Sequence, residues 1–283
     1  GMGMAERLYR NGWEPFDYLK VSVVQNPLEY MNFNKSPFGE EFRYLIKERI
    51  KNFWGYGNLN GDVWFVGMEE GYNQNNEVLL ERLKATANAE VFDIYDDLRV
   101  DPGHVYWFED GAPTQSTYRK LIYLLIYLRS GKEPTLEEIR EYQIKKFGRK
   151  SSDHAVLELM PLPCKSIQKA DWIYGSFGID GLSSRKEYLA TYKPVRVERL
   201  RSLIKDHKPK LVVFYSRLYA EDWALVAGVS FTEIIPGKLS IAKDDGTVYA
   251  IVPHSTARGH SNNDWRDIAE GIRPLHPLSL EEV

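Results

Sequence analysis

Residues 62–67 read DVWFVG, a short apolar run that ends in glycine. A run of this length closed by glycine is typical of a strand buried on both faces. Similar runs cover residues 155–160, 210–215 and 247–252, and segments with helical spacing lie between them. Strands that alternate with helices predict a mostly parallel sheet. We therefore expect an α/β fold, a three-layer sandwich with helices on both faces of a central sheet.

Helices are predicted where apolar residues recur at helical spacing and a capping residue stands at the start. Thr135 begins a capping box, and Ser261 is placed to cap the last helix. The predicted helices cover residues 38–53, 75–87, 115–129, 135–147, 194–206, 221–227 and 261–272. Strands are also expected at 231–235 and 239–243, the second joined to 247–252 as a hairpin, and loops at 96–115 and 171–184.

The composition is that of a globular protein. The chain has 283 residues, of which 43% are hydrophobic and 27% charged, which excludes a disordered or collagen-like chain. The longest apolar stretch, residues 121–128, is far shorter than the ~20 residues of a membrane span. We expect a single domain over residues 1–283, with 1–36 as an N-terminal extension, located in the cytoplasm. Because Cys164 is the single cysteine, no disulfide or multi-cysteine metal site is expected, and no cofactor either.

Charge is unevenly distributed along the chain. Residues 67–110 hold eleven acidic and three basic side chains, whereas residues 183–217 hold ten basic and three acidic ones. The formal net charge of −3 gives the whole chain no attraction to polyanions. Any binding of nucleic acid would therefore depend on a local basic surface. The basic segment is either such a phosphate-binding surface or an ordinary solvated face.

Polar residues gather after the predicted parallel strands, where α/β sheets bind ligands. Residues 67–73 read GMEEGYN and residues 253–261 read PHSTARGHS. Glycines let the backbone approach a ligand, and a carboxylate there can orient a water molecule. His254, directly at a strand end, can donate a hydrogen bond to developing negative charge. Both segments also have a purely structural interpretation, because acids are favoured before a helix and polar loop residues can cap one.

Four short motifs stand in or after the predicted strands: GMEEG at 67–71, PLPC at 161–164, KPKLVVFY at 208–215 and HSTARG at 254–259. In this order they resemble the motifs of the uracil-DNA glycosylase superfamily. The resemblance spans about residues 62–272 and implies a uracil-DNA glycosylase-like fold. It implies that Glu69 positions the hydrolytic water and that His254 donates to the departing base.

The resemblance also implies a set of ligand-binding residues and an activity. Arg258 stands where the family presses a side chain into the minor groove, and Tyr72 or Trp172 would stack on a flipped base. The expected activity is hydrolysis of the N-glycosidic bond of a base in DNA. The implied binding residues are Gly67, Met68, Glu70, Tyr72, Asn73, Ser255 and Arg258, with no metal.

The chain also departs from the family pattern. Members that read uracil have an asparagine near the end of a middle strand, where this chain has Glu158 and Leu159. Glu70 and Ser255 stand where the family usually has prolines. These departures keep a second function open, a catalytically inactive module of the same fold that binds nucleic acid or a nucleotide. A small-molecule enzyme that uses the same strand ends is the third possibility, because fold does not determine function.

Overall fold

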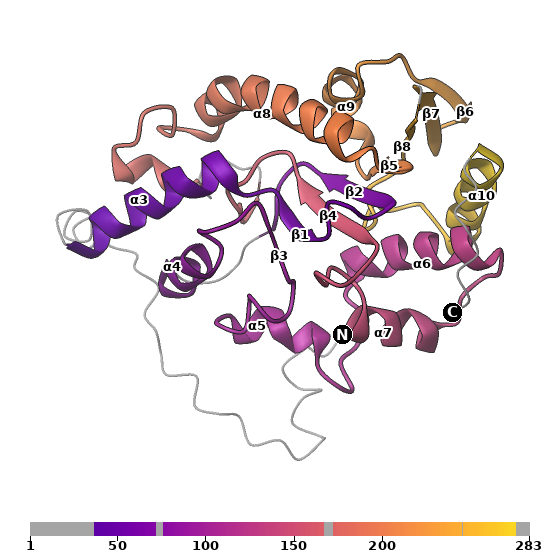
Figure 1. The fold of residues 1–283 in the computed structure, drawn as a ribbon, viewed down its shortest axis with the longest axis horizontal. Coiled ribbons are helices and arrows are strands. Elements are labelled where there is room, and N and C mark those ends of the chain that lie inside the picture. The colour runs from indigo at the N-terminus through magenta and orange to yellow at the C-terminus, as the bar shows by residue number, and fades with distance from the viewer. Residues whose placement is uncertain (1–36, 72–75, 167–171, 245, 276–283) are drawn as a thin grey trace.

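A mixed eight-stranded sheet crosses the molecule (Figure 1). The computed structural model describes residues 37–71, 76–166, 172–244 and 246–275, so the expected N-terminal extension, 1–36, lies outside the described residues. The strand order is β3-β1-β4-β2-β5-β8-β7-β6. The strands are β1 (Gly55–Gly57), β2 (Val63–Gly67), β3 (Val91–Phe92), β4 (His154–Glu158), β5 (Leu211–Phe214), β6 (Thr232–Ile235), β7 (Leu239–Lys243) and β8 (Val248–Ile251).

The parallel part of the sheet is its centre. Strands β4, β2, β5 and β8 pair parallel to one another, whereas β1 is antiparallel to β4. At the other margin β6, β7 and β8 form antiparallel pairs, as the predicted hairpin requires. The expected mostly parallel sheet is therefore a mixed one. Strands β1 and β3 were not predicted, because two or three residues are too few to show a periodicity.

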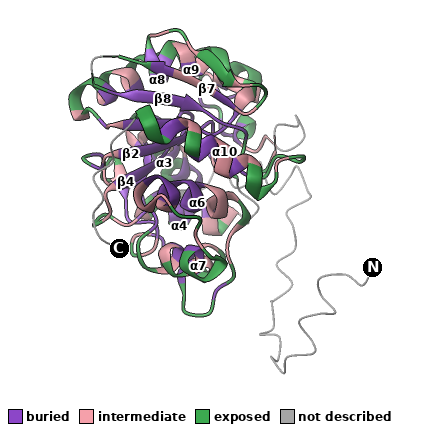
Figure 2. Ribbon diagram, turned by 90° about the vertical axis from the view of Figure 1, so that its right-hand side faces the viewer, coloured by how far each residue is buried: buried purple, intermediate pink, exposed green. Residues whose placement is uncertain are grey.

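Helices cover both faces of the sheet, as the figures show and as the sequence predicts (Figures 1 and 2). In β2, Trp64 and Val66 pack into one apolar cluster, and Val63 and Phe65 into the other, because successive strand residues point to opposite faces. The first cluster includes residues of α3 (Pro37–Asn52), α4 (Asn76–Ala85), α8 (Arg185–His207) and α9 (Ala220–Ala227). The second includes residues of α6 (Ser116–Ser130), α7 (Leu136–Lys145) and α10 (Asn262–Ile272).

The sequence predicts the first residues of two helices correctly and those of a third incorrectly. Thr135 and Ser261 both form the predicted capping boxes. The predicted basic helix, however, begins at Arg185, where Ser184 caps it, and Pro194 lies inside it. Proline commonly opens a helix, but here the missing N–H is one lost bond in a 23-residue helix that packs on the core.

The predicted loops contain short helical turns. Residues 96–115 hold α5 (Pro102–Val105) and a 3-10 turn at Tyr106–Phe108, and residues 171–184 hold another at Tyr174–Phe177. Within the described ranges, no helix combines the length and apolar character needed to cross a membrane.

Candidate functional site

The carboxyl ends of the central strands open into a hollow of about 440 Å³, within the ~300–1,000 Å³ range of small-molecule sites. Glu69, Glu158, Tyr215 and His254 line it, from the ends of β2, β4, β5 and β8. Strand β2 lies between β4 and β5, so the strand order reverses here, as it does at ligand sites of open α/β sheets. Glu69 and His254, far apart in sequence, thus border the same hollow.

A second hollow of about 480 Å³ adjoins the first. Glu69, Tyr215 and His254 line both, which makes these three side chains the boundary between them. Met68, predicted as a binding residue, lines the second hollow. The two predicted catalytic side chains therefore lie where two cavities meet.

The two carboxylate oxygens of Glu69 differ in their contacts. Arg185, in the first turn of α8, donates from Nε to Oε1 over 3.1 Å and also from Nη2. Oε2 is buried and has no hydrogen-bond partner among the described residues. Burial raises the pKa of Glu69, and the Arg185 guanidinium acts against that rise. Sequence reasoning missed Arg185, which a distant helix supplies.

His254 is held in one tautomer by its own loop. The backbone N–H of Thr256 lies 3.3 Å from Nδ1, and Thr256 Oγ1 lies 2.9 Å from it. A backbone N–H can only donate, so Nδ1 accepts and the proton of the neutral ring sits on Nε2. Desolvation lowers the pKa of His254, which favours this neutral form. The ring is 5.9 Å from that of Tyr215, centroid to centroid.

Glu158 and Tyr215 form a buried pair beneath Gly67. Tyr215 Oη donates to Glu158 Oε1 over 3.0 Å, while Oε2 is buried without a partner in the described ranges. Burial, and then the charge of Glu70, raises the pKa of Glu158 well above its ordinary value. A Cβ on Gly67 would lie 2.4 Å from Tyr215 Oη and 2.6 Å from Glu158 Oε2. Gly67, predicted as a binding residue, is therefore glycine because this pair fills the space beside it.

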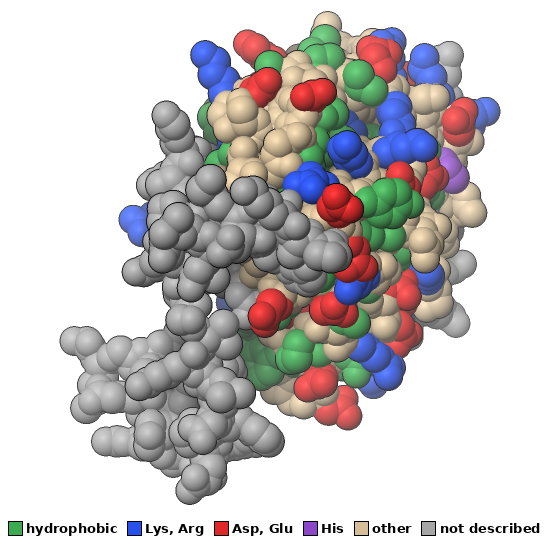
Figure 3. Space-filling model, turned by 90° about the vertical axis from the view of Figure 1, so that its left-hand side faces the viewer, with side chains coloured by type: hydrophobic (Ala, Val, Ile, Leu, Met, Phe, Trp, Pro, Cys, Tyr) green, Lys and Arg blue, Asp and Glu red, His purple; other side chains and the backbone are tan. Residues whose placement is uncertain are grey.

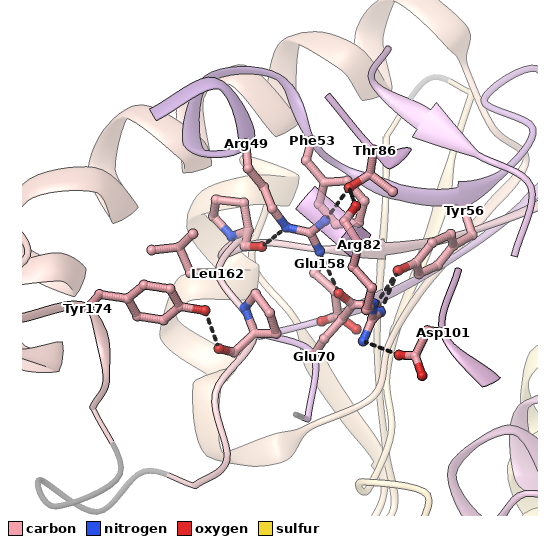
Figure 4. A network of polar contacts seen from close by, with 12 residues as sticks. Arg49, Phe53, Tyr56, Glu70, Arg82, Thr86, Asp101, Glu158, Leu162 and Tyr174 are labelled. Atoms are coloured by element: carbon pink, nitrogen blue, oxygen red, sulfur yellow. Dashed lines mark hydrogen bonds and ion pairs between the residues drawn. The ribbon is translucent and has the colours of Figure 1, made fainter. Parts of the chain in front are cut away.

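Glu70, also predicted to bind ligand, lines the first hollow, but both of its oxygens accept hydrogen bonds from the protein (Figure 4). Oε2 accepts from Arg49 Nη2 over 2.6 Å, and Oε1 accepts from Tyr56 Oη over 2.5 Å and from Arg82 Nη2 over 3.2 Å. Burial alone would raise the pKa of Glu70, but Arg82 and Arg49 lower it. Arg49 also donates to Pro161 O over 2.8 Å and so ties this network to the loop after β4.

The remaining predicted binding residues are scattered. Ser255 is buried, and its hydroxyl has no partner in the part of the chain described here. Arg258 is exposed on the same loop and lines neither hollow. Tyr72 and Asn73 lie outside the described residues.

Trp172 is not placed to stack on a ligand. Its indole N–H donates to Leu182 O over 2.7 Å, and its ring packs against Tyr174 and Tyr188, away from both hollows. Trp107 and Tyr118 instead line the first hollow. Trp107 lies in the predicted loop 96–115 and Tyr118 in the predicted helix 115–129, and neither pattern indicated a ligand-facing role.

Four side chains of the basic segment are engaged in contacts within the protein. Arg185 is paired with Glu69, Lys193 with Asp222, and Arg217 with Glu233. Arg196 is buried, with its guanidinium carbon 3.3 Å from the centroid of the Trp54 ring. On the face drawn in Figure 3, basic and acidic side chains are interspersed.

The first hollow is lined by carboxylates, phenols and imidazoles, among other groups. No cluster of three or more His, Cys, Asp or Glu side chains suited to a metal ion occurs within residues 37–71, 76–166, 172–244 and 246–275. No protein-family model matches the chain, and no curated protein sequence matches it significantly.

Proposed function

We propose that the protein hydrolyses the N-glycosidic bond of a base in DNA, on a fold of the uracil-DNA glycosylase type. One observation carries the proposal: the unpartnered oxygen of Glu69 and the neutral imidazole of His254 belong to side chains that line one hollow at the strand-order reversal. The order of the four sequence motifs resembles that of uracil-DNA glycosylases, in which the matching side chains cleave the bond between a base and its sugar. The hollow is large enough for a flipped heterocyclic base.

The proposed reaction uses both side chains. Water adds to C1′ of the sugar while the bond from C1′ to the base nitrogen breaks and leaves its electron pair on the base. Glu69, as the carboxylate, orients the water, takes its proton and stabilises the positive charge on the sugar. His254 donates a hydrogen bond from Nε2–H to the base as negative charge builds there. Because burial raises the pKa of Glu69, the rate rises as pH increases through that pKa.

The test is release of free base from single-stranded and duplex DNA that contains uracil or hypoxanthine. Glu69→Gln is expected to lower the rate by a factor of about 10² to 10⁴, the usual contribution of a general base. His254→Ala is expected to lower it by about 10² to 10³. Glu81→Gln, on the exposed side of α4, is the matched control and leaves the rate unchanged. Equal rates in all four proteins would refute the assignment.

A second candidate is a non-catalytic module of the same fold that binds nucleic acid or a nucleotide. The observation that favours it is the pairing of Arg185, Lys193 and Arg217, which reduces the positive charge available to hold a DNA substrate. Salt-dependent mobility shifts of DNA without base release, from every substrate tested, would favour this candidate over the hydrolase.

A further inference from the structure

Arg185 makes the one ion pair of Glu69 within the described ranges, although the two residues lie 116 positions apart in the chain. Its Nε donates to Glu69 Oε1 over 3.1 Å, and its Nη2 donates to the same oxygen. The two side chains are only 14% and 11% exposed, so water and salt screen this pair less than a surface pair. Two charge-assisted hydrogen bonds also restrict the orientation of the carboxyl group.

Arg185 occupies a helix position that normally favours acids. It is the first residue of α8, directly after the cap Ser184. The N-terminal end of a helix carries partial positive charge, so a cation there is unfavourable unless an anion compensates it. Glu69 supplies that anion from the segment after β2. A departure from local preference of this kind is expected where a residue serves a site rather than its own helix.

No second cation pairs with Glu69 in the part of the chain that the structure describes. The two arginines of the neighbouring network are bound to Glu70, and Arg217, which lines the second hollow, is paired with Glu233. The other titratable groups around Glu69 are acids, phenols and imidazoles: Glu70 beside it, Tyr188 of α8, Glu158 at the end of β4, Tyr215 after β5, Tyr219 of the turn Arg217–Tyr219, and His254 and His260 after β8.

Without Arg185, burial alone would govern the ionisation of Glu69. Removal from water disfavours the charged form of a carboxyl group and raises the pKa of Glu69, and the Arg185 guanidinium opposes that rise. A protonated Glu69 can neither take a proton from water nor stabilise positive charge on a sugar. The ionised form that the proposed reaction needs therefore depends on Arg185, a residue that lines neither hollow.

We propose that Arg185 is a positioning residue: through its ion pair it keeps Glu69 a carboxylate, held in one orientation, at the boundary between the two hollows. The reactive role of Glu69 in this inference rests on the proposed function. The electrostatic role of Arg185 follows from the ion pair itself, so it can be measured without any substrate.

The test is a titration of the Glu69 carboxyl carbon by ¹³C NMR in the full chain, with its signal identified by its loss in Glu69→Gln. In Arg185→Gln the midpoint is expected to move to higher pH by about one unit or more, because an opposite charge in direct contact is removed. Arg185→Lys keeps the charge but offers a single ammonium in place of two guanidinium N–H groups. Its midpoint is expected to lie between those of the wild type and Arg185→Gln.

A matched control and a stability measurement separate positioning from support of the fold. Lys186→Gln removes a charge from the same turn of α8, but this exposed side chain is not paired with Glu69, so the midpoint is expected to stay at the wild-type value. Urea denaturation reports any loss of stability, which a purely structural role would produce without moving the midpoint. If Arg185→Gln does not fold, the midpoint of Arg185→Lys, expected above that of the wild type, carries the test.

An unchanged midpoint in the Arg185 variants, or an equal shift in Lys186→Gln, would overturn the inference. Release of base from DNA by the same proteins tests the proposed function separately. A shifted midpoint in Arg185→Gln without base release from any protein would leave this inference standing and refute the proposed hydrolysis. Base release by the wild type with an unchanged midpoint in Arg185→Gln would do the reverse.

Discussion

Glu69 and Glu70 are neighbours in the chain and differ in almost every physical respect. Glu70 is held by two arginines and a tyrosine, and its pKa is lowered. Glu69 meets one arginine, keeps Oε2 without a partner among the described groups, and its pKa is raised. The difference arises because the two successive residues face different neighbours, with Arg49 of α3 and Arg82 of α4 around Glu70 and Arg185 of α8 beside Glu69.

The comparison distinguishes an acid bound within the fold, Glu70, from an acid with an unpartnered oxygen, Glu69. A carboxylate whose two oxygens both accept hydrogen bonds from buried groups of the protein stabilises the fold. A carboxylate with a free oxygen beside a cavity carries an unmet interaction that a water molecule or ligand can complete. Variants that remove one acid at a time test whether the two divide their roles in this way.

The largest expected effect is on stability. Glu70→Ala leaves the buried guanidiniums of Arg49 and Arg82 without their counter-charge, which is expected to cost about 3–5 kcal/mol in the free energy of unfolding. Urea denaturation measures it. Glu81→Ala, which breaks an exposed ion pair on α4, is the matched control and should cost about 0–1 kcal/mol. Equal costs for the two variants would contradict the structural role of Glu70.

The same variant has a predictable pH dependence. A carboxyl whose pKa is lowered by folding contributes stability that is complete above its unfolded pKa and is lost as pH falls through the folded pKa. Glu70 is such a group, because Arg82 and Arg49 outweigh its burial. The difference in unfolding free energy between wild type and Glu70→Ala should therefore shrink on acidification. A difference that grew in acid would show that the pKa of Glu70 is not lowered.

An intermediate effect is expected at Gly67. In Gly67→Ala the new methyl would overlap Tyr215 Oη and Glu158 Oε2, so the pair must shift. We expect a loss of about 1–3 kcal/mol in the free energy of unfolding, measured by urea denaturation. Gly71→Ala is the matched control for stability, because a methyl there meets no atom within 4 Å. Equal losses in Gly67→Ala and Gly71→Ala would show that the Glu158–Tyr215 pair does not fill the space beside Gly67.

The smallest expected effect is at Arg258. This side chain is exposed, so Arg258→Ala should change the unfolding free energy by less than about 0.5 kcal/mol. If it contacts phosphate, DNA affinity falls and the slope of log affinity against log salt decreases by about one unit. Lys205→Ala, near the far end of α8, should leave both measurements unchanged. Matching behaviour of the two variants would remove Arg258 from the binding surface.

The sequence predicted the features that depend on local pattern. The apolar run of β2, the capping boxes of α7 and α10, and the alternation of strands and helices each follow from neighbouring residues. The same pattern placed Glu69 and His254 after parallel strands, and parallel strands end at one edge of a sheet. The shared hollow of these two residues was therefore predictable.

Features that depend on long-range contacts were missed. Arg196 reads as one of ten basic residues in its segment, yet it is buried against Trp54 and donates to the Leu159 and Phe53 carbonyls. Arg185 reads the same way and is the partner of Glu69. Charge counts along a chain cannot show which cations lie in the core, because the distant carbonyls and carboxylates that bind them have no local sequence signal.

The segments that carry Glu69 and Glu158 remain bonded after their strands have ended. Leu159 N–H donates to Gly67 O over 2.9 Å, Met160 N–H to Met68 O over 2.7 Å, and Cys164 N–H to Glu70 O over 2.9 Å. This stitched backbone preorganises the two carboxyl groups, so an occupant has little conformational entropy to remove on binding. The hollow is therefore rigid. A ligand that matches its shape binds without rearrangement, whereas a wider ligand cannot separate the two segments without breaking main-chain hydrogen bonds.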